Sequence, residues 1–142
     1  MSLYALGIDC GNTAVKAAIF DQNGTEVAAV ANNYPTHIPH PDHTEADLAE
    51  CWQLCADAIR RVIAAAGIEA TQIAALGCSG HGNGVYLLDE QREPMSAIKS
   101  LDNRAEHEVS QLQASADYQA VVRRNRQGAW SSQTSVMLHW LK

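Results

Sequence analysis

The first thirty residues alternate short apolar runs with turns, a pattern that predicts β-strands before any helix. The runs cover residues 3–8, 15–20 and 26–30. The dipeptide Asn23-Gly24 separates the second run from the third, and Asn-Gly tolerates the positive φ that a tight hairpin turn requires. We therefore predict that the chain opens with an antiparallel meander of three strands.

A long amphipathic helix is predicted after residue 44. Its apolar positions fall at i, i+3, i+4 and i+7 and are Leu48, Cys51, Trp52, Cys55, Ile59, Val62, Ile63 and Ala66. Thr44 is a suitable N-cap, and Asp47 three residues later resembles a capping box. Gly67 is a natural stop signal at the carboxyl end.

Shorter elements are predicted in the rest of the chain. Strands are expected at 73–78 and 85–88, a turn at 89–92, and helices at 104–112, 117–124 and 135–142. Strands, a long helix and further strands indicate an α/β fold. Three antiparallel strands before the first helix favour a ribonuclease H-like domain over a doubly wound one. The last predicted helix has no stop signal, so we expect residues 1–142 to be an incomplete domain of a longer protein.

Composition and charge exclude several classes of partner. The formal net charge of −6 argues against broad attraction to nucleic acid, and no apolar run is long enough to cross a membrane. The four cysteines contain no CxxC pair, and Cys51 and Cys55 lie on the apolar helix face, where packing explains them. We expect a reduced, cytoplasmic protein without a disulfide framework or a zinc ribbon.

The turn after the first strand has the composition of a phosphate-binding loop. Asp9 ends a predicted buried strand, and Gly11 allows close approach of the backbone to a ligand. Asn12 and Thr13 add backbone N–H groups and a hydroxyl that can surround phosphate oxygens, and Lys16 adds a positive charge. A carboxylate beside a phosphate requires a metal between them, so Asp9 indicates Mg²⁺ held through water. The alternative is an ordinary hairpin with an Asp-Gly turn.

Two later loops carry polar side chains that suit a sugar. Residues 77–84 are rich in glycine and present His81 and Asn83, which can exchange hydrogen bonds with sugar hydroxyls. From the residues alone, a flexible turn explains this loop equally well. Asp102 and Arg104 stand where a loop meets a predicted helix and could bind a polyol, although helix capping is slightly favoured.

Four segments together resemble the start of the FGGY carbohydrate kinases. They are LGIDCGNTAVKAAIFDQNG, LGCSGHGNGVYLLD, LDNRAEHE and RQGAWSSQTSVMLHWLK, and the resemblance extends over nearly the whole chain. Within the family, GHGNGVYLLD and RQGAW…LHWLK are most similar to the L-xylulose (3-keto-L-gulonate) kinases. The His81-Gly82-Asn83 triplet differs from the one that xylulokinases usually carry.

The resemblance implies a two-domain enzyme that binds ATP and a sugar between ribonuclease H-like domains. By position, the residues facing ATP phosphates and Mg²⁺ would be Asp9, Gly11, Asn12, Thr13 and Lys16, and those facing the sugar His81, Gly82, Asn83, Asp102 and Arg104. The family's catalytic aspartate is expected beyond Lys142, so residues 1–142 alone should be nearly inactive.

The implied reaction transfers a phosphoryl group from ATP to a hydroxyl of a keto-sugar such as L-xylulose or a related pentulose. The enzyme could assemble as a homodimer. The alternative is an inactive regulatory module of the same fold that binds a nucleotide or a sugar.

Overall fold

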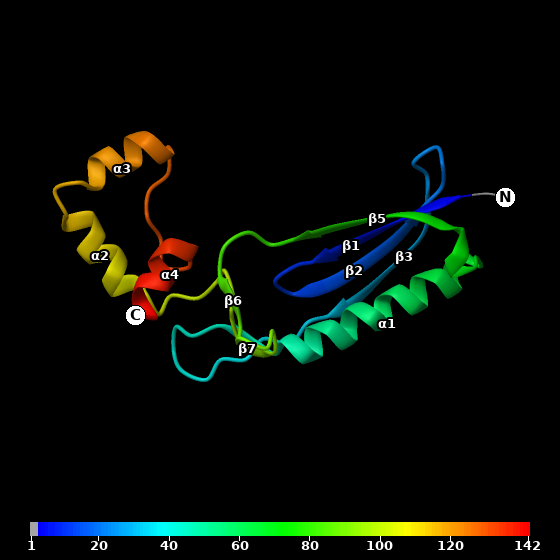
Figure 1. The fold of residues 1–142 in the computed structure, drawn as a ribbon, viewed down its shortest axis with the longest axis horizontal. Coiled ribbons are helices and arrows are strands. Elements are labelled where there is room, and N and C mark those ends of the chain that lie inside the picture. The colour runs from blue at the N-terminus through cyan, green and yellow to red at the C-terminus, as the bar shows by residue number, and fades with distance from the viewer. Residues whose placement is uncertain (1–2) are drawn as a thin grey trace. The chain divides into compact units, whose positions relative to one another are not determined.

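The computed structural model describes residues 3–142, which divide into two units (Figure 1). Unit 1 contains the described residues up to Pro35 together with Leu48–His81. Unit 2 contains Thr36–Asp47 and Gly82–Lys142. Each unit has its own sheet and its own cluster of buried apolar side chains.

Unit 1 is built on a four-stranded sheet with the order β3-β2-β1-β5. The strands are β1 (Tyr4–Cys10), β2 (Ala14–Phe20), β3 (Glu26–Asn33) and β5 (Ile73–Gly80). The first three are antiparallel, whereas β5 runs parallel to β1. This arrangement confirms the predicted opening meander. Its β2–β3 turn has Gly24 at φ 79°, and Asp21 Oδ1 accepts a hydrogen bond from the Asn23 backbone N–H at 2.8 Å.

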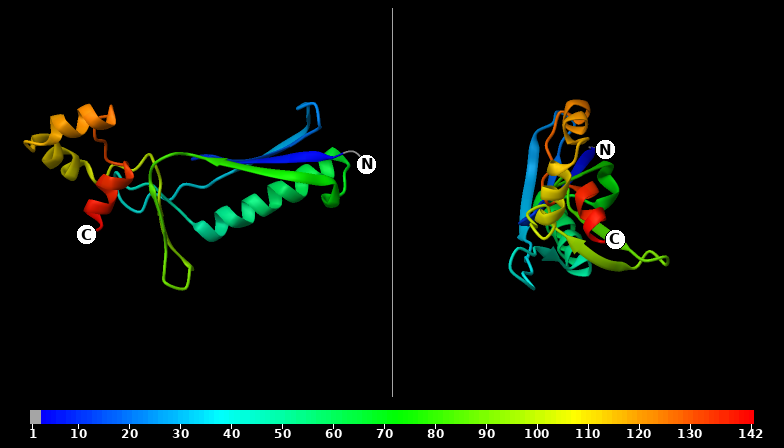
Figure 2. Two further views of the ribbon diagram at one scale, coloured as in Figure 1. Left: turned by 45° about the horizontal axis from the view of Figure 1, so that its top comes forward. Right: turned by 90° about the vertical axis from the view of Figure 1, so that its left-hand side faces the viewer.

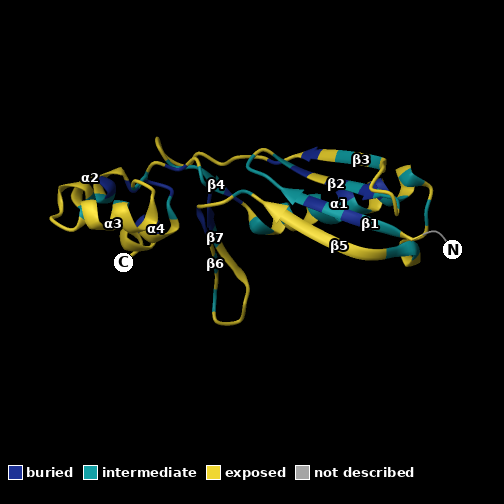
Figure 3. Cartoon of the chain, turned by 90° about the horizontal axis from the view of Figure 1, so that it is seen from above, coloured by how far each residue is buried: buried dark blue, intermediate teal, exposed yellow. Residues whose placement is uncertain are grey.

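One face of this sheet is covered by α1 (Leu48–Ala66), which lies along the strands in Figure 1. Alternate strand residues join the helix in one core, whose buried members are Leu6, Ile8, Val15, Ala17, Ile19, Ala58 and Val62. Figure 3 shows buried positions on β1 and β2, while β5 is exposed along most of its length. The helix ends as predicted: Gly67 adopts φ 64° and its N–H donates to the Ala64 carbonyl. A short 3₁₀ turn, η1 (Ala70–Gln72), leads into β5.

Two predictions about the beginning of α1 are wrong. The helix begins at Leu48, so Thr44 is not its N-cap; the Thr44 N–H instead donates to Asp102 Oδ2 at 2.6 Å. Trp52 is 71% exposed and does not belong to the core. It follows Cys51 by one residue, which turns it by about 100° around the helix and away from the sheet.

Unit 2 combines a small antiparallel sheet with three helices. The sheet has the order β4-β7-β6, with β4 (Glu45–Ala46), β6 (Val85–Leu88) and β7 (Pro94–Ile98). The helices are α2 (Glu106–Ala114), α3 (Tyr118–Asn125) and α4 (Thr134–Trp140), all close to their predicted positions. Figure 2 shows β6 and β7 as a hairpin. The buried apolar cluster consists of Val85, Ile98, Ala105, Val109, Val136 and Met137. Among the helices of residues 3–142, none is long and apolar enough to span a membrane.

Gly84 adopts a backbone conformation that leaves no room for a side chain. Its φ is 76°, and a Cβ there would lie 2.4 Å from the Ile98 carbonyl oxygen. We expect Gly84→Ala to lower the free energy of unfolding by more than the roughly 1–2 kcal/mol of a left-handed backbone alone. Urea denaturation followed by circular dichroism measures this.

Gly82→Ala in the same loop is the matched control, because no atom lies within 4 Å of a Cβ built there. Equal stability of the two variants would contradict the proposed steric conflict at Gly84.

Candidate functional site

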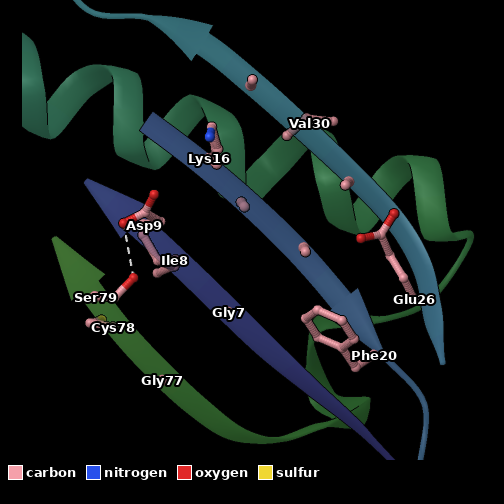
Figure 4. Close-up of a pocket in the computed structure, with 14 residues that line it drawn as sticks. Gly7, Ile8, Asp9, Lys16, Phe20, Glu26, Val30, Gly77, Cys78 and Ser79 are labelled. Carbon is pink, nitrogen blue, oxygen red and sulfur yellow. Dashed lines mark hydrogen bonds between the residues drawn. The ribbon is translucent and has the colours of Figure 1, made fainter. Parts of the chain in front are cut away.

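Asp9 lies next to the end of β1, between the two strands that pair with β1. Its register partners are Lys16 on β2 and Ser79 on β5. The Ser79 hydroxyl donates a hydrogen bond to Asp9 Oδ1 at 2.9 Å, drawn as the dashed line in Figure 4. Within residues 3–142, Oδ2 of Asp9 receives no hydrogen bond. The sheet thus places a carboxylate, a hydroxyl and an ammonium group on three neighbouring strands.

These three side chains border a cavity of about 620 Å³ over the strands of unit 1. Figure 4 shows Asp9 and Ser79 directed toward each other at one end of the cavity, with Phe20 and Glu26 toward the other. Small residues, including Gly7 and Gly77, form much of its floor and leave room above the sheet. The charged groups of Asp9 and Lys16 thus lie at the edge of this cavity.

The loop between β1 and β2 is held in a tight turn. The Gly11 N–H donates to the Ala14 carbonyl at 3.0 Å, and the Thr13 carbonyl accepts from the Tyr34 N–H at 2.7 Å. A Cβ on Gly11 would lie only 3.3 Å from the Ala14 oxygen. The amide of Gly11 is therefore occupied inside the turn. Thr13 is exposed, and Asn12 is half-buried.

The side chains at this end of the sheet are chemically suited to a hydrated Mg²⁺ ion and to phosphate oxygens. A carboxylate oxygen without a hydrogen-bond donor is a ligand that Mg²⁺ accepts, directly or through water. Lys16 and the Thr13 hydroxyl can interact with phosphate oxygens. The group of residues predicted from the sequence for phosphate is thus compatible with that role, and Ser79 joins it.

His81 is tied to the strand that carries Asp9. Its backbone N–H donates to the Cys10 carbonyl at 3.3 Å, and its ring Nδ1 lies 3.2 Å from the same oxygen. Because a carbonyl oxygen only accepts, Nδ1 carries the proton in this contact. The candidate sugar residue is therefore fixed relative to the candidate phosphate loop within unit 1.

Gly82 and Asn83 belong to unit 2 and are both exposed. Asn83 adopts a left-handed backbone with φ 69°, a conformation that asparagine tolerates better than most residues. The next residue, Gly84, donates its N–H to the Ser132 carbonyl at 2.9 Å, which anchors the end of this loop.

Asp102 is completely buried and accepts four hydrogen bonds in unit 2. Oδ1 accepts from the backbone N–H and from Nε of Arg104, each at 2.9 Å. Oδ2 accepts from an Arg104 terminal nitrogen at 2.9 Å and from the Thr44 N–H at 2.6 Å. The suggestion that Asp102 caps a helix is wrong, because α2 begins at Glu106 and its N-cap is Ala105.

Arg104 completes this cluster. The same terminal nitrogen donates to Glu45 Oε1 at 2.6 Å, and the guanidinium lies 5.2 Å from the centre of the Trp140 ring. Burial opposes the charge of Arg104, but hydrogen bonds and charges from Asp102 and Glu45 outweigh it and raise its pKa. Asp102 and Arg104 thus join the 102–104 turn to the segment before α1.

Two of these residues, Ser79 and Glu45, were not singled out from the sequence. Ser79 meets Asp9 only through the parallel pairing of β5 with β1, and Glu45 meets Arg104 from a strand of two residues. Neither contact could be predicted from the residues that surround Ser79 or Glu45 in the sequence. Among residues 3–142, no group of three His, Cys, Asp or Glu side chains has the arrangement of a metal cage.

Comparisons with known proteins agree on one family. The N-terminal domain of the FGGY family of carbohydrate kinases matches residues 4–142. A probable L-xylulose kinase of Haemophilus influenzae is 39% identical over 140 residues, which are 98% of this chain and 29% of the relative. The L-xylulose/3-keto-L-gulonate kinase of Escherichia coli is 34% identical over 143 residues, with coverage of 100% and 29%.

Solved structures agree on the fold. A xylulose kinase from Rhodospirillum rubrum superimposes with a TM-score of 0.87 at 24% identity, covering 97% of this chain and 28% of that one. The predicted α/β, ribonuclease H-like fold is thus confirmed. The chain spans less than a third of the length of the relatives it matches. On the match to residues 4–142, the chain belongs to the FGGY family of carbohydrate kinases.

Proposed function

We propose that the complete protein is an ATP-dependent kinase of a keto-sugar, such as L-xylulose or a related pentulose. The observation that carries this proposal is the grouping of Asp9, Lys16 and Ser79 at the edge of the 620 Å³ cavity in a domain of this family. The names of the two relatives support the choice of sugar. We also propose that the reaction takes place in the cytoplasm.

In this proposal, the loop between β1 and β2 of unit 1 binds the phosphates of ATP. Lys16 would neutralise phosphate charge, while Asn12 and Thr13 would offer hydrogen bonds to phosphate oxygens. Gly11 would contribute by keeping the turn tight, because its own N–H is used within it. Asp9 would hold Mg²⁺ through water, and the ion would supply positive charge to balance that of the transferring phosphoryl group.

The second loop and the Asp102 cluster form the proposed sugar side. His81 and Asn83 would exchange hydrogen bonds with sugar hydroxyls, and Gly82 would allow the substrate to approach the backbone. We propose that Asp102 and Arg104 serve the sugar side by fixing its loops, since the Asp102 carboxylate is fully occupied within unit 2. The general base that accepts the sugar proton is proposed to belong to the second domain of the complete enzyme.

Turnover of the complete protein tests this function. We expect ADP to form only when a pentulose is present, and chelation of divalent metal by EDTA to abolish the activity until Mg²⁺ is restored. A coupled assay of ADP release across pentuloses and keto-acids measures both effects. Sugar or ATP binding by calorimetry without any sugar-dependent ADP would reject the kinase and favour a regulatory module.

A further inference from the structure

A cavity of about 400 Å³ lies between α2 and α4 of unit 2, two helices that Figure 1 shows next to each other. Its lining combines polar and apolar side chains from both helices: Glu108, Gln111, Leu112, Ser135, Val136 and His139. None of them belongs to the groups proposed above for ATP or the sugar. The volume falls within the roughly 300–1,000 Å³ of small-molecule pockets. The cavity is therefore a candidate for a binding site separate from the proposed kinase site.

Glu108 brings a carboxylate to this cavity, and part of that group lacks a partner. Its Oε2 is buried, and no group of residues 3–142 donates a hydrogen bond to it. A glutamate in the third position of a helix commonly accepts the N–H of the N-cap residue, here Ala105, but Oε2 makes no such contact. A buried carboxylate oxygen without a donor is costly, so a donor from outside the described residues is expected.

The other polar side chains of the cavity add hydrogen-bond acceptors. Gln111 Nε2 lies 2.8 Å from His107 Nε2, and because an amide nitrogen only donates, the ring nitrogen accepts here. Within residues 3–142, the amide oxygen of Gln111 accepts no hydrogen bond. The Ser135 hydroxyl can also accept, as can one nitrogen of a neutral His139 ring. No lysine or arginine among the described residues lines the cavity. The lining therefore suits a ligand that brings donors and a positive charge.

We propose that the cavity between α2 and α4 binds a small organic cation, an alkylammonium ion whose charged group pairs with Glu108. An ammonium group has three N–H donors and no acceptor, which matches a carboxylate that shares its cavity with an amide oxygen and a hydroxyl. Leu112 and Val136 supply apolar wall against which the alkyl chain can pack. A nucleotide or a sugar phosphate does not suit this cavity, because its negative charge would face that of Glu108.

Binding of n-hexylammonium to the complete protein, followed by saturation-transfer NMR, tests the proposal. We expect saturable binding of this probe and much weaker binding of 1-hexanol, which has the same chain and no charge. Glu108→Gln keeps the size of the side chain and removes its charge, so Kd should rise roughly 10- to 100-fold, the size expected for losing a hydrogen bond to a charged group. Glu106→Gln is the matched control, because this exposed carboxylate of the same helical turn does not line the cavity, and it should leave Kd unchanged.

Urea denaturation of the same variants shows whether the complete protein already supplies a donor to Glu108. If a ligand is the partner of this carboxylate, Glu108→Gln should be at least as stable as the unmodified protein in the absence of the probe, because no hydrogen bond is lost. A clear loss of stability would mean that the protein's own donor occupies Oε2, and the proposal would be wrong. Absence of saturable binding, equal binding of 1-hexanol, or an unchanged Kd in Glu108→Gln would also overturn it. None of these outcomes depends on kinase activity.

Discussion

Replacing Asp9 by asparagine should lower kcat of the complete protein by roughly 100- to 1,000-fold, the size expected for losing one group that stabilises transition-state charge. Asparagine keeps the shape of the side chain and can still accept the hydrogen bond from Ser79. It removes the negative charge that would hold Mg²⁺ beside the phosphates. The substitution therefore tests the negative charge of Asp9 while the shape of the side chain and its position in the sheet are kept.

Steady-state kinetics at saturating ATP and sugar measure this effect, and a series of Mg²⁺ concentrations gives the apparent affinity for the metal. Because Asp9 is only partly buried at the end of β1, we expect the free energy of unfolding to change by less than about 1 kcal/mol. Glu90→Gln, at an exposed carboxylate of the β6–β7 turn, is the control and should leave both properties unchanged. A fully active, Mg²⁺-responsive Asp9→Asn enzyme would remove Asp9 from the phosphate site.

The parts of the fold that were predictable depend on local chemistry. Asn23-Gly24 specifies a hairpin and Gly67 a helix end because each supplies a backbone conformation that neighbouring residues cannot easily adopt. The short apolar runs at residues 3–8 and 15–20 predicted the strands β1 and β2, and in the structure one face of each is buried under α1. These signals lie within a few residues of the feature that they determine.

The wrong predictions concern residues whose contacts are decided by parts of the chain that are distant in sequence. Thr44 has the chemistry of an N-cap, but its segment pairs with β7 and its N–H donates to Asp102, 58 residues away. Trp52 fits a helical period, yet the sheet contacts only a narrow stripe of α1 around Ala58 and Val62. Helix propensity could not predict either outcome, because both depend on which secondary-structure elements pack against each other.

In the candidate site too, some residues could be identified from the local sequence, whereas others depend on how distant elements pack together. The loop of Asp9 to Lys16 could be identified because its members are consecutive or on adjacent strands of one hairpin. The contact of Ser79 with Asp9 could be found only once the parallel strand β5 was placed beside β1. The roles of all these residues toward ATP and sugar stay predictions until the kinetic experiments are done.

Removing the Asp102 carboxylate should strongly destabilise unit 2, because this buried group accepts four hydrogen bonds there. In Asp102→Ala, the Thr44 N–H and the Arg104 guanidinium lose their buried acceptor, and Arg104, whose side chain is 6% exposed, keeps only Glu45 as an acidic partner. Breaking a buried ion pair by removing one partner costs about 3–5 kcal/mol. We expect a loss of that size in the free energy of unfolding, measured by urea denaturation.

Asparagine at the same position distinguishes a supporting role from direct contact with the sugar. Both Asp102 oxygens accept hydrogen bonds from N–H donors, so either orientation of the amide would place an NH₂ group against another donor. Asp102→Asn should therefore also be destabilised, by at least about 1–3 kcal/mol for a buried group left unsatisfied. Asp117→Ala is the control: this exposed carboxylate makes no capping hydrogen bond to α3, so stability should change by less than about 0.5 kcal/mol. If Asp102→Asn instead unfolds like the unmodified protein and raises only KM for the sugar, Asp102 contacts the sugar directly and the supporting role is wrong.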